Sequence, residues 1–224
     1  MNILVIASHA DDEVLGCGGS IAQYVKDGHH VYVCIVTSAY TPDWSAEFIT
    51  NRRREIEDAH RILQIKKTFL LDLPAAKLDT IPQKELNNAL LDVVKEINPD
   101  VVLLPHGGDL NKDHRLVFEA GLVATRPLHG LRIQKILCYE TVSETEWGRI
   151  LGNFVPTYYV GISQEGLQVK LGAMKAYSSE MREYPHPRSL ELLEALAKVR
   201  GSEAGVAVAE AFMLVRGVEH SNNT

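Results

Sequence analysis

SHADDE, residues 8–13, places a histidine and three consecutive acids directly after a short apolar run at residues 3–7. The apolar run predicts a buried strand, and the glycine-rich segment at residues 16–19 predicts a turn that leads into a helix. In open α/β sheets, ligands bind outside the carboxyl ends of the strands. Three adjacent carboxylates repel one another unless a cation or a proton offsets their charge. A divalent metal ion at the end of this strand is the simplest offset.

Strand-like and helix-like segments alternate along the rest of the chain. Apolar, β-branched runs predict strands at residues 3–7, 30–37, 67–71, 100–104, 133–140 and 158–162, with a last edge strand at 211–215. Helical periodicity predicts helices at residues 20–26, 47–65, 83–97, 115–124, 167–177 and 189–200. This alternation predicts an α/β fold: a single Rossmann-like domain over residues 1–224, with a mostly parallel sheet and helices on both faces. We expect the polar tail after Val218 to be flexible.

The composition is that of an ordinary soluble globular protein, with 46% hydrophobic and 23% charged residues. A formal net charge of −6 argues against a nucleic-acid partner, and neither a signal peptide nor a membrane-spanning run is predicted. Cys17, Cys34 and Cys138 are widely spaced, which favours buried, reduced thiols. We therefore expect a cytoplasmic protein with no nucleic-acid or membrane partner.

The glycines at residues 16–19 invite comparison with a dinucleotide site. Phosphate-binding loops, however, place their glycines directly after the strand, where bare N–H groups meet the anion. Here three acids occupy that position and would repel a pyrophosphate, and the G-x-G-x-x-G spacing is absent. We expect the glycines to allow tight packing between strand and helix beneath the acidic segment.

A second segment rich in His and Asp, PHGGDLNKDH at residues 105–114, follows the predicted strand at residues 100–104. His9, Asp12 and His114 together offer two imidazoles and a carboxylate, a set typical of catalytic zinc with one position left open for water. Such a metal lowers the pKa of bound water and polarises a carbonyl. Asp11, beside a predicted ligand, is then the candidate general base. Each residue alone could be an ordinary loop residue; two such loops together favour a metal site.

SHADDEVLGCGGSI resembles the AHPDDExxGxGG signature of the LmbE-like, or PIG-L-type, zinc-dependent N-deacetylases. Arg52 and Glu55 match the R-x-x-E helix of this family, and residues 105–114 match its second metal motif, which ends in Asp-His. HPRS at residues 186–189 and AEAF at residues 209–212 are similar to the C-terminal segment of bacterial members. The resemblance covers nearly the whole chain.

The resemblance implies a hydrolase that removes an N-acetyl group, usually from a glucosamine-type sugar. It implies one zinc ion per chain, held by His9, Asp12 and His114, although other divalent metals could occupy such a site. It also implies that Asp11 is the base.

Two further roles follow from the same match. Asp113 is expected to support a ligand or relay a proton, and Arg52 to bind sugar hydroxyls. The alternative for Arg52 is an ion pair with Glu55.

The sequence departs from the family pattern at two positions. Ala10 replaces the usual proline, which should loosen the turn without removing a ligand. Asn111 stands where many members have a histidine assigned to proton donation or oxyanion stabilisation. An asparagine can donate a hydrogen bond to substrate but cannot supply a proton.

His186, in a segment stiffened by two prolines, is the candidate for the missing catalytic donor. Some family members complete their sites with a histidine from a neighbouring subunit. We therefore expect a homo-oligomer in which His186 reaches the metal pocket in cis or in trans. The alternative is an ordinary exposed loop histidine.

Taken together, the residues and the resemblance predict a cytoplasmic zinc-dependent N-deacetylase acting on an N-acetylglucosamine-type amino sugar or its conjugate. One alternative is a metal-dependent amidohydrolase acting on another small N-acyl metabolite. Another is a metal-binding protein that has lost its catalytic activity, against which the spare carboxylate of Asp11 argues.

Overall fold

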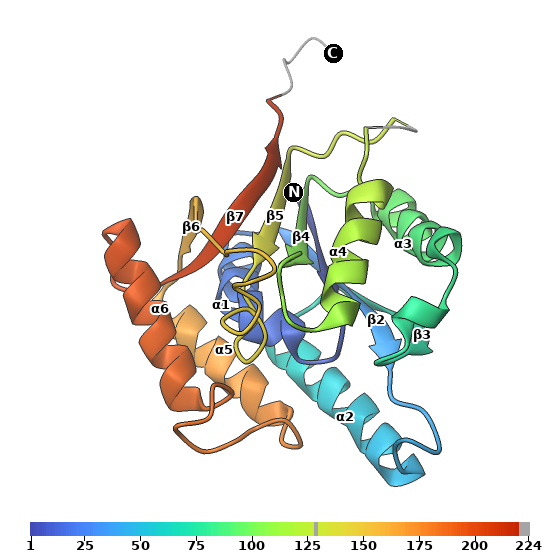
Figure 1. Ribbon diagram of the computed structural model, residues 1–224. Helices are drawn as coiled ribbons and strands as arrows, with labels where there is room; N and C mark the ends of the chain where they lie inside the picture. Colours follow the sequence, from blue (N-terminus) through green and yellow to red (C-terminus); the bar gives the residue numbers. More distant parts are fainter. Residues whose placement is uncertain (128–129, 220–224) are drawn as a thin grey trace.

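The computed structural model describes residues 1–127 and 130–219, whose strands form one seven-stranded sheet (Figure 1). The strands lie in the order β3-β2-β1-β4-β5-β7-β6. β1 to β5 pair in parallel, whereas β7 is antiparallel to both β5 and β6. The strands are β1 Asn2–Ala7, β2 His30–Ser38, β3 Lys67–Pro74, β4 Val101–Pro105, β5 Lys135–Tyr139, β6 Tyr158–Gly161 and β7 Ala209–Gly217.

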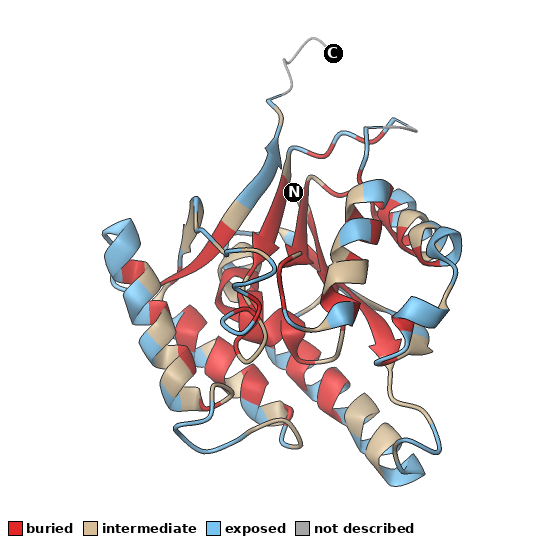
Figure 2. Ribbon diagram, viewed as in Figure 1, coloured by how far each residue is buried: buried red, intermediate tan, exposed pale blue. Residues whose placement is uncertain are grey.

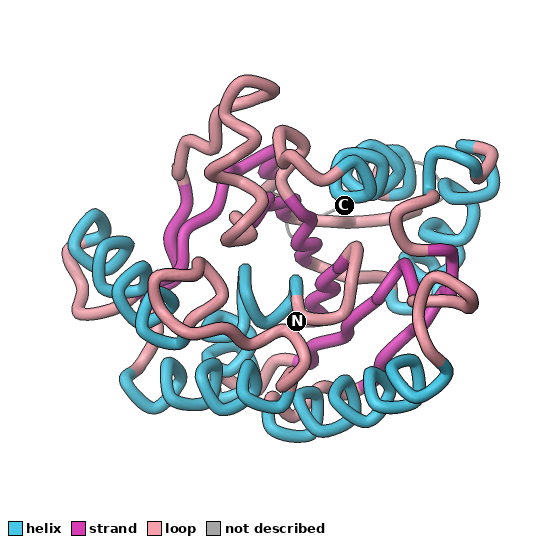
Figure 3. The backbone as a smooth tube through the Cα atoms, turned by 60° about the horizontal axis from the view of Figure 1, so that its bottom comes forward, coloured by secondary structure: helices cyan, strands magenta, loops and turns pink. Residues whose placement is uncertain are grey.

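Helices cover both faces of the sheet (Figure 3). In β1, Ile3 and Val5 face a core shared with α1, α2, α5 and α6, and Leu4 and Ile6 face a second core shared with α3 and α4. Figure 2 shows the buried strands between these layers. The predicted fold class is therefore confirmed. The helices are α1 Asp12–Lys26, α2 Ala46–Ile62, α3 Gln83–Ile97, α4 Lys112–Ala124, α5 Gln164–Ala176 and α6 Leu190–Ala204, with a short 3-10 helix, η1, at Leu78–Thr80.

Four helices, α1, α2, α4 and α5, begin earlier than the sequence predicts, α2 by only one residue and the others by three or more. α1 begins at Asp12 and kinks at Cys17, whose φ of −146° is not helical, so the predicted turn at residues 16–19 lies within it. A Cβ at Gly16 would lie 2.2 Å from the Tyr139 ring, which shows that this glycine allows the helix to approach the sheet. α4 begins at Lys112, so Asp113 and His114 lie on its first turn and not in a loop.

The prediction that the last strand lies at the edge is wrong. β7 lies between β5 and β6, and the four-residue β6 forms that edge of the sheet. The first half of β7, residues 209–212, is buried, as expected for a strand paired on both sides, and only its second half is exposed. That exposed half gives the sequence its edge-like character.

Three smaller expectations concern the ends, the thiols and the membrane. The tail expected to be flexible after Val218 lies largely outside the described residues. Cys17, Cys34 and Cys138 are all buried and free, as expected. Among the helices described, none is both long and apolar enough to cross a bilayer.

Candidate metal-dependent active site

β1 and β4 are parallel neighbours, so their carboxyl ends meet at one edge of the sheet. SHADDE follows β1, and residues 106–114 follow β4. Asn111 caps α4 by accepting a hydrogen bond from the Asp113 N–H at 3.0 Å. This cap starts α4, whose first turn carries His114, beside the SHADDE segment that follows β1. The two predicted loops therefore lie together at this edge of the sheet.

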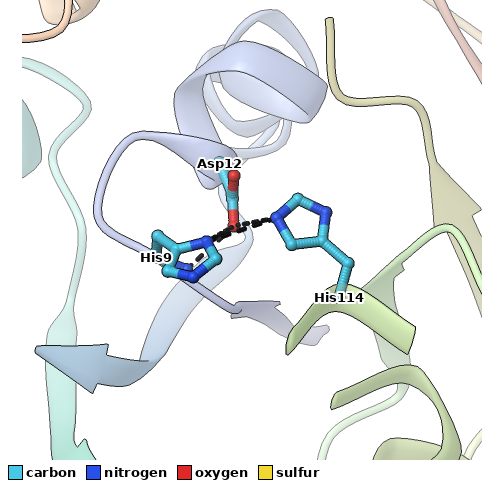
Figure 4. A group of neighbouring side chains, drawn as sticks. All are labelled: His9, Asp12 and His114. Atoms are coloured by element: carbon cyan, nitrogen blue, oxygen red, sulfur yellow. Dashed lines mark hydrogen bonds and ion pairs between the residues drawn. The ribbon is translucent and has the colours of Figure 1, made fainter. Parts of the chain in front are cut away.

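His9, Asp12 and His114 bring one ligand atom each into a small group (Figure 4). His114 Nε2 lies 3.2 Å from Asp12 Oδ2 and 3.3 Å from His9 Nδ1, and His9 Nδ1 lies 3.6 Å from Asp12 Oδ2. A tetrahedral zinc ion with bonds of about 2.0–2.1 Å would separate its ligand atoms by about 3.3 Å. The three atoms therefore fit a zinc ion. The His9 side chain is 25% exposed and lines a cavity, so the group is open on that side.

Each histidine is held from behind by a carboxylate. His9 Nε2 lies 3.1 Å from Asp113 Oδ2, and His114 Nδ1 lies 2.8 Å from Asp109 Oδ2. Asp109 is fully buried and accepts a further hydrogen bond from Thr145 Oγ1 at 2.6 Å. Such carboxylates fix the ring orientation and leave the other nitrogen unprotonated for a metal.

The structure thus places Asp113 against His9, one of the predicted metal ligands. Sequence reasoning missed Asp109. The available signal was that a histidine ligand usually has an acceptor behind it, and Asp109 is an acid in the same loop.

The imidazoles and carboxylates of this group shift one another's pKa values. Burial by itself lowers the pKa of His9 and His114, but the neighbouring carboxylates of Asp12, Asp109 and Asp113 outweigh it and raise these pKa values to about 9 and about 10. Burial raises the pKa of Asp12, but the two imidazoles outweigh it and hold that pKa well below its usual range. A metal cation would take the place of imidazole protons here.

Asp11 is not part of this group and lines the cavity onto which His9 also opens. Its Oδ2 lies 3.2 Å from Arg188 Nη1. Burial raises the pKa of Asp11 well above its usual range, although the Arg188 guanidinium lowers it. A buried carboxylate with a raised pKa, two residues from one ligand and adjacent to another, suits a general base.

The cavity has a volume of about 280 Å³. Its polar end holds Asp11, Arg52 and Arg188, and the Glu180 carboxylate bridges the two arginines, with Arg188 Nη1 at 2.5 Å. The rest of its wall includes apolar side chains, namely Trp44, Phe48, Ile49 and Leu70. Sequence reasoning missed Arg188 and Glu180, because nothing in their local sequence shows that residues 178–189 fold back over the end of β1.

The remaining predicted site residues divide into two groups. Arg52 and Asn111 both line the cavity. Arg52 contacts Glu180 more closely than Glu55, whose Oε2 lies 3.6 Å from Arg52 Nε. His186 is exposed, does not line the cavity, and accepts a hydrogen bond from the Arg188 N–H at 3.0 Å through Nδ1. Within one chain, the structure does not bring His186 to the metal group.

Comparison with known proteins places this site in a family. Residues 4–125 match the PIG-L family, described as GlcNAc-PI de-N-acetylase. The chain is 32% identical over 185 residues to the uncharacterized deacetylase YaiS of Escherichia coli, covering 79% of this chain and 90% of that protein. It is 25% identical over 228 residues to the diacetylchitobiose deacetylase of Thermococcus kodakarensis, covering 96% of this chain and 84% of that one.

Among solved structures, the conserved protein TT1542 of Thermus thermophilus superimposes with a TM-score of 0.78 at 25% identity. That alignment covers 99% of this chain and 98% of TT1542. The fold and the paired His/Asp loops define an α/β protein with a candidate metal site at the carboxyl ends of its parallel strands. The chain belongs to the PIG-L, or LmbE-like, family.

Proposed function

We propose that this protein is a zinc-dependent N-deacetylase that hydrolyses the acetamide of an N-acetylglucosamine-type amino sugar or its conjugate. The observation that carries the proposal is the group formed by His9, Asp12 and His114, with Asp11 beside it in a cavity. A metal held for structure alone has no use for a spare buried carboxylate at its open side. Deacetylase relatives, one of them named for diacetylchitobiose, support the choice of substrate.

Zinc bound by these three residues would lower the pKa of a water molecule and polarise the acetyl carbonyl. Asp11 takes up the proton that the attacking water gives up, and can pass it to the amine nitrogen as the amide C–N bond breaks. The products are acetate and the free amine. Asp113 and Asp109 hold the two imidazoles in place during this cycle.

Substrate recognition falls to the polar end of the cavity. Arg52 and Arg188 offer N–H donors to sugar hydroxyls, and Glu180 offers an acceptor between them. The side-chain oxygen of Asn111 is used in capping α4, so its NH₂ group is the part that faces substrate. The apolar wall beside Trp44 suits the carbon face of a sugar ring.

The proposal extends to assembly. His186 is exposed in one chain, and the segment between β5 and β6 exposes Trp147 at 68%, Ile150 at 92% and Val155 at 57%. Large apolar side chains exposed within one segment are candidates for an interface. A homo-oligomer that brings His186 of one subunit to the site of another accounts for both features. Three free thiols fit a reducing, cytoplasmic compartment.

The test is amine release from N-acetylglucosamine conjugates by the zinc-loaded protein, with and without a chelator. Asp11→Asn is the matched variant, because asparagine keeps the shape and removes the base. We expect it to retain zinc and to lose about 10²- to 10⁴-fold in kcat, with little change in KM. Activity within a few-fold of wild type in Asp11→Asn would contradict the role of Asp11.

The alternatives have different outcomes. If only other N-acyl metabolites release amine, then the protein is an amidohydrolase of different specificity. If no amide is hydrolysed although zinc binds, then it is a metal-binding protein without this activity.

A further inference from the structure

Glu13 is the third acid of SHADDE and the one that the proposed chemistry leaves unused. Its side chain is fully buried, whereas Asp12 faces the metal group and Asp11 faces the cavity. Glu13 belongs to neither of those sets. A buried carboxylate is costly unless its oxygens are satisfied, so the contacts of Glu13 indicate what it is for.

The Glu13 carboxylate is fixed from two other helices. Its Oε1 accepts a hydrogen bond from the Tyr177 hydroxyl, just after α5, at 2.7 Å. The same oxygen lies 3.2 Å from Nε2 of His60 on α2, whose Nδ1 lies 2.6 Å from Thr68 Oγ1. The position of this carboxylate is therefore set by the packing of the domain.

The second oxygen of Glu13 reaches back to the base. Glu13 Oε2 accepts a hydrogen bond from the Asp11 backbone N–H at 3.2 Å. Asp11 has φ 114° and ψ −26°, a left-handed conformation that non-glycine residues seldom adopt. Such a conformation persists only where the surroundings hold it.

The hydrogen bonds of Asp11 account for how it is held. Its carbonyl accepts from the N–H groups of Val14 at 3.0 Å and Leu15 at 2.9 Å, which anchors one side of the turn to α1. The N–H on the other side is held by Glu13. The turn sends Asp11, Asp12 and Glu13 in three directions, so that one acid faces the cavity, one the metal group and one the core.

We propose that Glu13 is a positioning residue: its buried carboxylate holds the Asp11 backbone in the left-handed turn that aims the base at the open side of the metal group. This inference rests on the proposed function in so far as Asp11 is the base. It assigns Glu13 no contact with substrate or metal.

The experiment compares three variants of the zinc-loaded protein. Glu13→Met removes both oxygens at nearly constant volume. Glu13→Gln keeps one oxygen that can accept from Asp11 N–H, so it tests for an acceptor and not for charge. Tyr177→Phe is the matched control, because it removes a contact of Oε1 and leaves the Asp11 contact intact. The measurements are bound zinc, kcat and KM on an N-acetylglucosamine conjugate, and the melting temperature.

We expect Glu13→Met to lose about 10- to 100-fold in kcat while KM and bound zinc stay within threefold. Glu13→Gln and Tyr177→Phe should keep kcat within fivefold, even where the melting temperature falls. A kcat of Glu13→Met within threefold of wild type would overturn the proposal, and so would an equal loss in Tyr177→Phe. Should Glu13→Met fail to fold, Glu13→Asp replaces it with the same thresholds, since its carboxylate is one methylene too short to keep both sets of contacts.

A crystal structure of zinc-loaded Glu13→Met separates this inference from the proposed function, since it needs no substrate. We expect Asp11 to leave the left-handed region. An unchanged Asp11 backbone would overturn the positioning role whether or not the wild-type protein is a deacetylase. A wild-type protein that releases no amine would refute the proposed function and leave this structural result standing.

Discussion

Asp109 and Asp113 show that the proposed metal site extends beyond the three residues that would bind the metal. Each accepts from the far nitrogen of one imidazole, and Asp109 is tied to Thr145 on the segment that follows β5. A substitution at Asp109 tests this role with less disturbance of the backbone than one at Asp113. Asp113 also accepts hydrogen bonds from the N–H groups of Ala76 and Leu78, so its loss would disturb the backbone as well.

Asp109→Asn should weaken zinc binding about 10- to 100-fold. The amide cannot hold the charge that orients and polarises the His114 imidazole. The measurement is zinc affinity by competition with a chromophoric chelator, and Asp43→Asn on an exposed loop is the control. Zinc affinity equal to that of the control would show that Asp109 matters only for packing.

Arg52→Ala should raise KM by about 10- to 100-fold with kcat little changed, as expected for loss of a charged hydrogen bond made equally in substrate complex and transition state. Arg54→Ala, an exposed neighbour that does not line the cavity, is the control. If Arg52→Ala lowers only the melting temperature, then its contacts with Glu180 and Glu55 are its main purpose.

At the scale of elements, the kinked helix α1 depends on a buried ion pair. Glu210 on β7 accepts from the N–H groups of Gly19 at 3.0 Å and Ser20 at 2.6 Å, just after the kink. Lys170 on α5 donates to Glu210 at 2.5 Å and to the carbonyl of Leu15 at 2.9 Å, just before it. This pair satisfies the backbone groups that the kink at Cys17 releases.

Glu210→Ala should lower the free energy of unfolding by about 3–5 kcal/mol, because it leaves the Lys170 ammonium buried and unpaired. Adding Lys170→Met should recover part of that loss. Urea denaturation of the two single variants and the double variant measures the coupling. Lys198→Ala, which breaks an exposed pair with Glu194, is the control and should change little. Strictly additive losses would mean that the two residues do not act as a pair.

Local pattern predicted those elements whose signal lies within the element itself. α3 was predicted to its exact bounds, residues 83–97, because its buried positions Leu86, Leu90, Val93, Val94 and Ile97 repeat with the helical period. α1 was predicted to begin only at residue 20, because the glycine-rich segment at residues 16–19 does not favour a helix by itself. In the structure, Glu210 and Lys170 from far along the chain bind the backbone on either side of this segment. β7 was misplaced for a similar reason, since its neighbours in the sheet are not encoded in its own residues.

The site residues also divide into those with a local sequence signal and those placed by the packing of distant segments. His9, Asp12 and His114 could be proposed together because two loops with metal-binding residues follow strands that a parallel sheet makes neighbours. Arg188 and Glu180 could not be proposed, because only the packing of α5 and α6 beside α1 and α2 folds the segment between them over the cavity.

At the scale of the whole molecule, a bound metal would join SHADDE after β1 to the first turn of α4. A ligand that binds only the folded state stabilises it by about 2.7 kcal/mol at 100 times its Kd. For a domain of this size, that corresponds to a rise of about 5–10 °C in melting temperature. We expect such a difference between zinc-loaded and chelator-treated protein. In His114→Ala it should disappear together with stoichiometric zinc, and zinc retained in that variant would remove His114 from the ligand set.

The final prediction concerns the assembly and His186. Since His186 is exposed and absent from the cavity of its own chain, a catalytic role would require a neighbouring subunit. The exposed apolar side chains between β5 and β6 offer a surface on which such a subunit could pack. Light scattering should therefore find a homo-oligomer, and His186→Ala should lower kcat while keeping zinc.

Mixing two inactive variants tests whether one active site uses residues from two chains. His186→Ala and Asp11→Asn subunits are each inactive by expectation, and after mixing and subunit exchange some sites would combine an intact Asp11 with an intact His186 from the neighbour. Recovered amine release would then come only from residues shared between chains. A mixture that stays inactive despite exchange argues that the two residues must belong to one chain. A monomer in solution, or a His186→Ala enzyme with full activity, would show that His186 is an ordinary surface histidine whose Nδ1 holds the backbone of Arg188.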